Sequence, residues 1–80
     1  MGFAKDEAEI AGRLSEYLKA RIIAAKLTYG ELAELLRKHG HPNESAESIK
    51  QKLKRGTFPA TFFWATVAAL GLGRVDLRDL

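Results

Sequence analysis

Apolar residues along the chain recur at intervals of three and four, which is the spacing of an amphipathic helix. The first third carries one long stripe of this kind, made of Ile10, Leu14, Leu18, Ile22 and Ala25 and bordered by Tyr17 and Arg21. Asp6 is a suitable N-cap because its short carboxylate can accept from the first free amides of a helix. The pattern predicts a first helix over about residues 6–26.

A capping box marks the start of a second helix. Thr28 is followed three residues later by Glu31, so the hydroxyl and the carboxylate can each bond the backbone amide at the other position. Leu27 and Leu32 have the spacing of the hydrophobic staple that accompanies such a box. The second helix is predicted over residues 29–38. The segment 39–43, with one glycine and one proline, has the composition of a turn.

A third helix is predicted over residues 46–55, with Ser45 as its N-cap and Gly56 at its C-terminal end. Three apolar side chains share one face and are expected to point inward: Ala46, Ile49 and Leu53. The remaining side chains of this short segment are polar and mostly basic. The helix is therefore expected to be anchored from behind and to present a positive, hydrogen-bonding face.

A fourth helix is predicted over residues 59–70, with Pro59 at its first position and Gly71 after its end. It contains the run from Phe62 to Trp64. Three consecutive helical residues sweep about 200°, more than the apolar stripe that a surface helix normally buries. Phe63 and Val67 are the expected core residues, and Phe62 is expected beside Phe58.

Trp64 and the segment after the fourth helix have more than one interpretation. We expect the indole to pack under the C-terminal tail or against the first helix, since a single tryptophan in a small chain is usually buried. If Trp64 is exposed instead, it can form a self-association surface with Val75, Leu77 and Leu80. The tail, residues 72–80, alternates apolar and charged positions and fits a short strand, a loose helical turn or a partner-binding segment.

Length and composition restrict the class of protein. A chain of 80 residues makes one domain, residues 1–80, and buries only about 60 to 65% of its unfolded surface. The absence of cysteine excludes disulfides and thiolate zinc sites. No apolar run reaches the roughly 20 residues of a membrane span, and residues 1–6 lack the apolar segment of a signal peptide. We expect an all-α, compact four-helix bundle in the cytoplasm.

The net charge is only +3, too small to indicate nucleic acid by itself, but it is unevenly distributed. Residues 44–57 carry four basic and two acidic side chains, while residues 28–43 and 58–80 are each balanced. Two of the three excess charges therefore lie on the third helix and its ends. Charge alone fits an ordinary solvated helix face equally well.

The order of these elements resembles the helix-turn-helix domain of the Cro and phage-repressor type. The likeness covers roughly residues 10–72: the capping box with its Leu-Ala-Glu-Leu-Leu helix, the basic helix ending at Lys54, Arg55 and Gly56, and a helix closing with Ala-Leu-Gly. Small bacterial domains of unknown function, with a similar Glu-Leu-Ala helix and paired phenylalanines, resemble the chain more closely. The resemblance implies a nucleoid-associated transcriptional regulator that binds double-stranded DNA as a homodimer or within a larger regulatory complex.

The resemblance also implies roles for individual residues, with helix 46–55 as the recognition helix in the major groove. The phosphate contact at the start of the second helix falls on Tyr29, and the base contacts fall on Ser45, Glu47 and Gln51. Further phosphate contacts are Lys50, Lys54 and Arg55. Gln51 could pair with adenine, whereas Glu47 could accept from cytosine or repel the backbone.

One departure from the helix-turn-helix pattern is the connection at residues 37–44, which is several residues longer than usual. A tight turn holds the recognition helix at a fixed angle to the helix before it. A longer connection could rotate the basic face or leave it mobile. It therefore affects the positions of the individual contact residues more than it affects the fold.

The main alternative to DNA binding is a protein-interaction module that uses Trp64 and the C-terminal tail. Catalysis has little support. His39 and His41 flank a glycine in the predicted turn without carboxylate or cysteine partners, which is a poor metal pattern. No nucleophile has a histidine-carboxylate partner in view, and no Gly-rich phosphate loop opens a helix. We therefore predict no catalytic residue, metal, cofactor or small-molecule substrate.

Overall fold

Four helices build the domain in the computed structural model, which describes residues 6–80. They are α1 (Glu7–Ala24), α2 (Tyr29–Lys38), α3 (Ala46–Arg55) and α4 (Ala60–Ala69), followed by a single 3₁₀ turn, η1 (Leu77–Asp79). No strand occurs within the described range. The predicted all-α class is confirmed, and each predicted helix bound lies within two residues of the observed one. Residues 1–5 of the predicted domain lie outside the described residues.

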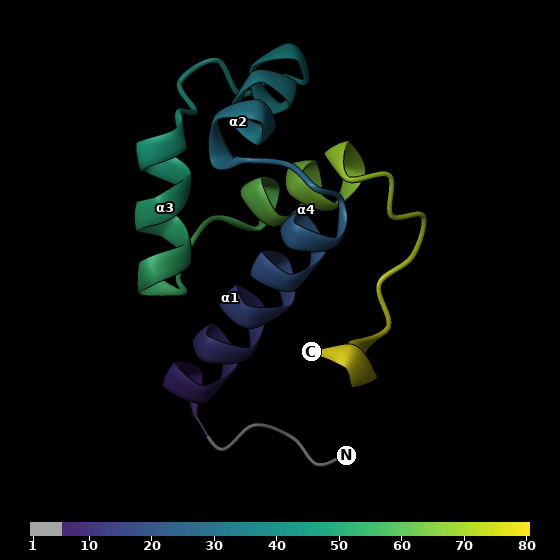
Figure 1. The fold of residues 1–80 in the computed structure, drawn as a ribbon. Helices are drawn as coiled ribbons and strands as arrows, with labels where there is room; N and C mark the ends of the chain where they lie inside the picture. Colours follow the sequence, from purple (N-terminus) through teal and green to yellow (C-terminus); the bar gives the residue numbers. More distant parts are fainter. Residues whose placement is uncertain (1–5) are drawn as a thin grey trace.

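The helices pack so that α3 lies at one edge of the molecule, with one side facing away from the others (Figure 1). α2 packs on both α3 and α4, and α1 packs on α3. The core draws on all four helices, and its largest fully buried apolar side chains are Leu18, Ile22, Leu32, Leu36, Ile49, Leu53 and Phe62. Burial of Ile49 and Leu53 confirms that α3 is anchored from behind.

Local capping starts α1, α2 and α3 as predicted, whereas Pro59, predicted as the first residue of α4, is its N-cap. The Asp6 carboxylate accepts from the Glu9 amide at 2.9 Å. Both hydrogen bonds of the Thr28–Glu31 capping box form, at 2.9 and 3.1 Å. Ser45 caps α3 in the same reciprocal way with Ser48, a partner that the sequence did not single out. The start of each of these helices is thus determined by residues at most three positions away.

The apolar stripe of α1 is shorter than predicted at both ends. Ile10 is 47% exposed, because the first turns of α1 extend beyond the other helices (Figure 1). Ala25 is exposed because it is the C-cap rather than a helical residue. The helix ends there since Lys26 adopts a left-handed conformation with φ 59°, and the Leu27 amide then bonds the Ile22 carbonyl at 3.3 Å.

Ala46 was expected to point inward and is exposed instead. The prediction is wrong because the buried stripe of α3 is narrow and contains only Ile49 and Leu53. Residues four apart on a helix lie almost in line, so Ala46 belongs with Lys50 and Lys54, which are exposed. The outward face of α3 therefore begins with a small side chain.

Trp64 is 73% exposed, so the expectation that it packs under the tail or against the first helix is wrong. Phe62 is the buried member of the run from Phe62 to Trp64, and its ring meets that of Phe58 edge-on at 5.2 Å between centroids, as predicted. Phe63 is only half-buried and stacks on Tyr17 of α1 with 6.5 Å between centroids. The observed rotation of α4 places Phe62 in the core and turns Trp64 outward.

The C-terminal segment adopts one of the three conformations that the sequence allowed, a short helical turn. Val75 and Leu80 are half-buried and pack on the core cluster, whereas Leu77 is 74% exposed. Asp76 caps η1 by accepting from the Arg78 amide at 2.9 Å and pairs with its guanidinium at 2.7 Å. The segment folds back toward α1 rather than extending away (Figure 1).

Candidate nucleic-acid interface

The outward face of α3 carries the residues predicted to meet DNA. Its exposed side chains are Ala46, Glu47, Lys50, Gln51, Lys54 and Arg55. The three cations Lys50, Lys54 and Arg55 make no ion pair or hydrogen bond with any other residue in the described part of the chain. This face therefore presents three positive charges that are not held in ion pairs.

The predicted base-contact residues extend along α3 from its N-cap, Ser45, to Gln51. Ser45 accepts from the Ser48 amide at 3.1 Å, so its oxygen is already used in capping. The Gln51 amide donates to the Glu47 carboxylate at 2.9 Å, and both side chains are exposed. Glu47 is thus paired with a neutral neighbour, and its negative charge remains on the face. Tyr29 stands apart, half-buried at the first position of α2.

The C-terminal end of α3 is fixed to α1 by two contacts. The Ser15 hydroxyl donates to the Leu53 carbonyl, and the bond is buried. Gly56, with φ 75°, lies so close to α1 that a Cβ atom there would be 2.8 Å from the Ala11 carbonyl oxygen. Sequence reasoning missed Ser15. It lies three residues before Leu18 and seven before Ile22, which places it on the buried side of α1.

Hydrogen bonds hold the long connection between α2 and α3. The His41 amide donates to the Leu36 carbonyl at 2.9 Å, and the Glu44 amide donates to the His41 carbonyl at 3.3 Å. The Arg37 guanidinium reaches across the connection to the Glu44 carbonyl at 2.8 Å. The extra length relative to a tight turn is therefore folded into a second, hydrogen-bonded turn.

Glu44 is the buried acid of this region, and only 7% of its side chain is exposed. Its two carboxylate oxygens each accept from the Lys52 ammonium at 2.8 Å, and the Ser48 hydroxyl donates to it at 2.6 Å. Sequence reasoning did not identify this pair. The spacing of four residues from Glu44 to Ser48 and from Ser48 to Lys52 was the available signal.

Lys52 is consequently not part of the exposed basic face. Besides its bonds to Glu44, the ammonium lies 5.0 Å from the centroid of the Phe62 ring, a cation–π contact. Of the four basic side chains in residues 44–57, three are therefore left to solvent. The charge excess predicted for the third helix survives, because Lys52 and Glu44 neutralise each other.

Comparison with known proteins places the chain in a family. A family model described as a domain of unknown function, DUF6471, matches residues 1–75. The chain belongs to the DUF6471 family. No curated protein and no solved structure gave a significant match to it.

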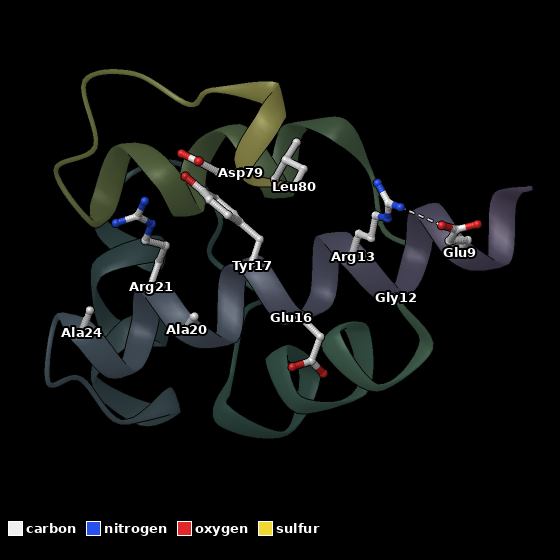
Figure 2. A pocket seen from close by; sticks show the side chains of 10 residues that line it. All are labelled: Glu9, Gly12, Arg13, Glu16, Tyr17, Ala20, Arg21, Ala24, Asp79 and Leu80. Atoms are coloured by element: carbon white, nitrogen blue, oxygen red, sulfur yellow. Dashed lines mark hydrogen bonds and ion pairs between the residues drawn. The ribbon is translucent and has the colours of Figure 1, made fainter. Parts of the chain in front are cut away.

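A surface groove of this DUF6471 domain, with a volume of about 920 Å³, lies on α1 beneath the C-terminal segment. Figure 2 shows the Tyr17 ring rising from α1 toward Asp79 and Leu80, with Arg13 and Arg21 on either side. Arg13 pairs with Glu9 at 2.7 Å, and Arg21 lies 5.2 Å from the Tyr17 ring centroid. Leu80 covers part of this face of α1.

His39 and His41 of the DUF6471 domain lie at the end of α2 and in the connection that follows, the first exposed and the second half-buried. Residues 6–80 contain no group of three histidine, cysteine, aspartate or glutamate side chains with the geometry of a metal site. Among the same residues, no helix has the length and apolar character needed to cross a membrane.

Opposing effects act on the pKa of Glu44 in the DUF6471 domain. Burial raises the pKa of its carboxyl, but the hydrogen bonds from Lys52 and Ser48 and the charges of Lys52 and His41 together lower it below the ordinary value of 4.5. The native state therefore favours the ionised form more than the unfolded chain does. This carboxylate contributes stability above its unfolded pKa, and that stability is lost as the pH falls through the lower, native pKa.

Replacing Glu44 with glutamine is expected to destabilise the domain most at neutral pH, because it leaves the Lys52 charge half-buried without a counter-ion. The difference in unfolding free energy from wild type should shrink as the pH falls from about 4.5 downward. Urea denaturation at intervals between pH 7 and pH 3 measures both curves. A difference that stays constant over this range would contradict the assigned role of the carboxylate.

Proposed function

We propose that the domain binds double-stranded DNA and acts as a small transcriptional regulator, with α3 in the major groove. The observation that carries the proposal is the row of unpaired cations, Lys50, Lys54 and Arg55, on the free side of a helix anchored by Ile49 and Leu53. The major groove admits an α-helix, and phosphate contacts supply much of the affinity. A helix held at the molecular edge suits such an approach.

Within this proposal the polar residues divide into two kinds of contact. Lys50, Lys54 and Arg55 bind phosphates and fix the register of the helix. Gln51 and Glu47 lie toward the base edges, where the amide suits adenine and the carboxylate suits the cytosine amino group. Tyr29 contacts a phosphate at the start of α2, and Ser45 contacts a base or a phosphate at the start of α3. The hydrogen bond between Glu47 and Gln51 orients the Gln51 side-chain amide in the free domain.

The test compares two charge-reduced variants by fluorescence anisotropy with mixed-sequence duplex DNA over a series of salt concentrations. Lys50→Gln with Lys54→Gln removes two cations from α3, and Lys26→Gln with Arg74→Gln removes two exposed cations from other segments. The first variant should lower the slope of log K against log salt by about two units, since each phosphate contact contributes about one. The control should change it little.

Equal effects of the two variants would mean that net charge, rather than the α3 face, controls binding. That result would contradict the assignment of α3. Absence of binding by the wild-type domain at low salt would contradict the proposed function itself.

A second candidate function, self-association through a protein-interaction surface, is supported by Trp64 and Leu77. Both are large apolar side chains that are more than 70% exposed, at 73% and 74%. Val75 and Leu80, the other members of the predicted surface, are half-buried on the core and would contribute only their exposed edges. Large exposed apolar side chains mark interaction surfaces, and a homodimer would let two α3 helices reach adjacent half-sites.

Sedimentation over a range of concentrations tests this candidate. The wild-type domain should show a mass that rises with concentration, and Trp64→Ala should remain a folded monomer, because the indole contributes little to the monomer core. Thr61→Ala, a substitution at another exposed position of α4, is the matched control and should leave the association unchanged. A wild-type domain that stays monomeric at all concentrations would contradict the candidate.

A further inference from the structure

Polar contacts link α2, the connection, α3 and α4 in series. Arg37, at the end of α2, donates to the Glu44 carbonyl at 2.8 Å. The Glu44 carboxylate accepts from Lys52 of α3, with 2.8 Å to each oxygen. The Lys52 ammonium in turn lies 5.0 Å from the Phe62 ring of α4. Glu44 is the one residue that takes part in both of the first two links.

Because the connection between α2 and α3 is long, these links contribute to the angle between the two helices, in addition to the contacts that hold the end of α3 to α1. A tight turn fixes the angle through its own backbone, whereas a longer connection leaves it to contacts between side chains. Apolar packing of Ile49 and Leu53 is not directional. The Lys52 ammonium bonds both oxygens of the buried Glu44 carboxylate, which holds the two side chains at one separation, and displacing either would leave an uncompensated buried charge.

We infer that Glu44 is a positioning residue, whose pair with Lys52, braced by Arg37 and Ser48, sets the angle of α3 to α2 and so the direction of the basic face. The consequence for DNA rests on the proposed function, while the angle itself does not. Nothing about Glu44 requires it to touch DNA, since the side chain is buried.

The double variant Glu44→Gln with Lys52→Met separates positioning from charge. It removes one negative and one positive charge, so the net charge of the domain is unchanged. Methionine keeps most of the lysine stem against Phe62, and the Ser48 hydroxyl retains the Ser45 carbonyl as an acceptor at 3.0 Å. Replacing a buried ion pair by neutral groups of similar volume is often nearly neutral for stability. The variant is expected to fold.

Residual dipolar couplings of backbone amides report the helix directions in solution, without DNA. In the double variant, the couplings of α1, α2 and α4 should still fit the wild-type arrangement, and those of α3 should not. DNA affinity should fall by about tenfold, comparable to the loss of one good base contact. If the α3 couplings fit the wild-type orientation, the positioning role is wrong.

Lys52→Arg changes the side-chain shape but keeps the ion pair with Glu44, so it should retain both the α3 couplings and the DNA affinity. If packing at position 52 were the cause of the displacement, this variant would show it as well. If the double variant does not fold, Glu44→Gln alone, which preserves the shape of the side chain, should show the same displacement of α3. A displaced α3 in the variant together with a wild-type domain that binds no DNA would support positioning and refute the proposed function.

Discussion

Replacing Gly56 with alanine is expected to destabilise the domain by about 3 kcal/mol or more. The left-handed backbone at φ 75° penalises any Cβ, by roughly 1–2 kcal/mol. The added atom would also lie 2.8 Å from the Ala11 carbonyl oxygen and 2.9 Å from the Ala11 Cβ. Because the oxygen belongs to the backbone of α1, relief requires the end of α3 to move away from α1. Urea denaturation monitored by circular dichroism measures the loss.

Gly71 provides the matched control for this substitution. It has the same φ of 75°, but an added Cβ would meet nothing within 4 Å. Gly71→Ala should therefore show only the backbone penalty, about 1–2 kcal/mol. Equal losses for the two alanine variants would mean that the close approach of α3 to α1 at Gly56 is not present in solution.

Alanine substitutions along the aromatic run of α4 should differ sharply in effect. Phe62→Ala is expected to cost about 3–5 kcal/mol, since the ring is 2% exposed and contacts both Phe58 and the Lys52 ammonium. Phe63→Ala should cost less, about 1–2 kcal/mol, because the side chain is only partly removed from water. Trp64→Ala should change the free energy of unfolding by no more than about 0.5 kcal/mol.

The same denaturation measurement on the three variants gives their order, and each serves as a control for its neighbours. The observed rotation of α4 requires the largest loss at position 62 and the smallest at position 64. A large loss of stability for Trp64→Ala would mean that the indole is buried in the core, and it would remove the support for a self-association surface.

Features that depend on neighbours in the sequence could be predicted. The Thr28–Glu31 box, the Ser45 cap and the glycine at the end of α3 involve residues close together in the chain. Their hydrogen bonds form in almost any folded context, since a helix must satisfy its free amides and carbonyls. For this reason the bounds of α2 and α3 agree with the predicted ones.

Features that depend on how helices pack could not be predicted from local patterns. α4 carries apolar side chains on nearly every side, so the sequence does not determine which aromatic ring faces the core. Ser15 meets Leu53 across 38 positions of sequence, and no local pattern shows that contact. Glu44 becomes a buried acid only because the connection folds back over Lys52, which its proximity to the start of α3 does not indicate.

The candidate interface was predictable in part for the same reasons. Helical periodicity placed Lys50, Gln51, Lys54 and Arg55 on the outward side of α3, because Ile49 and Leu53 had to face inward. It also placed Ala46 on the wrong side, since a stripe of two anchors is narrower than the pattern suggested. Helical periodicity did not distinguish Lys52 from the other basic residues of α3. Its ion pair with Glu44 could be seen only in the folded structure.

The central claim is that the outward face of α3 meets DNA, and amide chemical shifts test it most directly. Mixed-sequence duplex DNA is titrated into the ¹⁵N-labelled domain at low salt. The largest shift changes should fall on Glu47, Lys50, Gln51, Lys54 and Arg55, with little change along the α1 groove. No shift changes at low salt, or changes centred on α4 around Trp64, would contradict it.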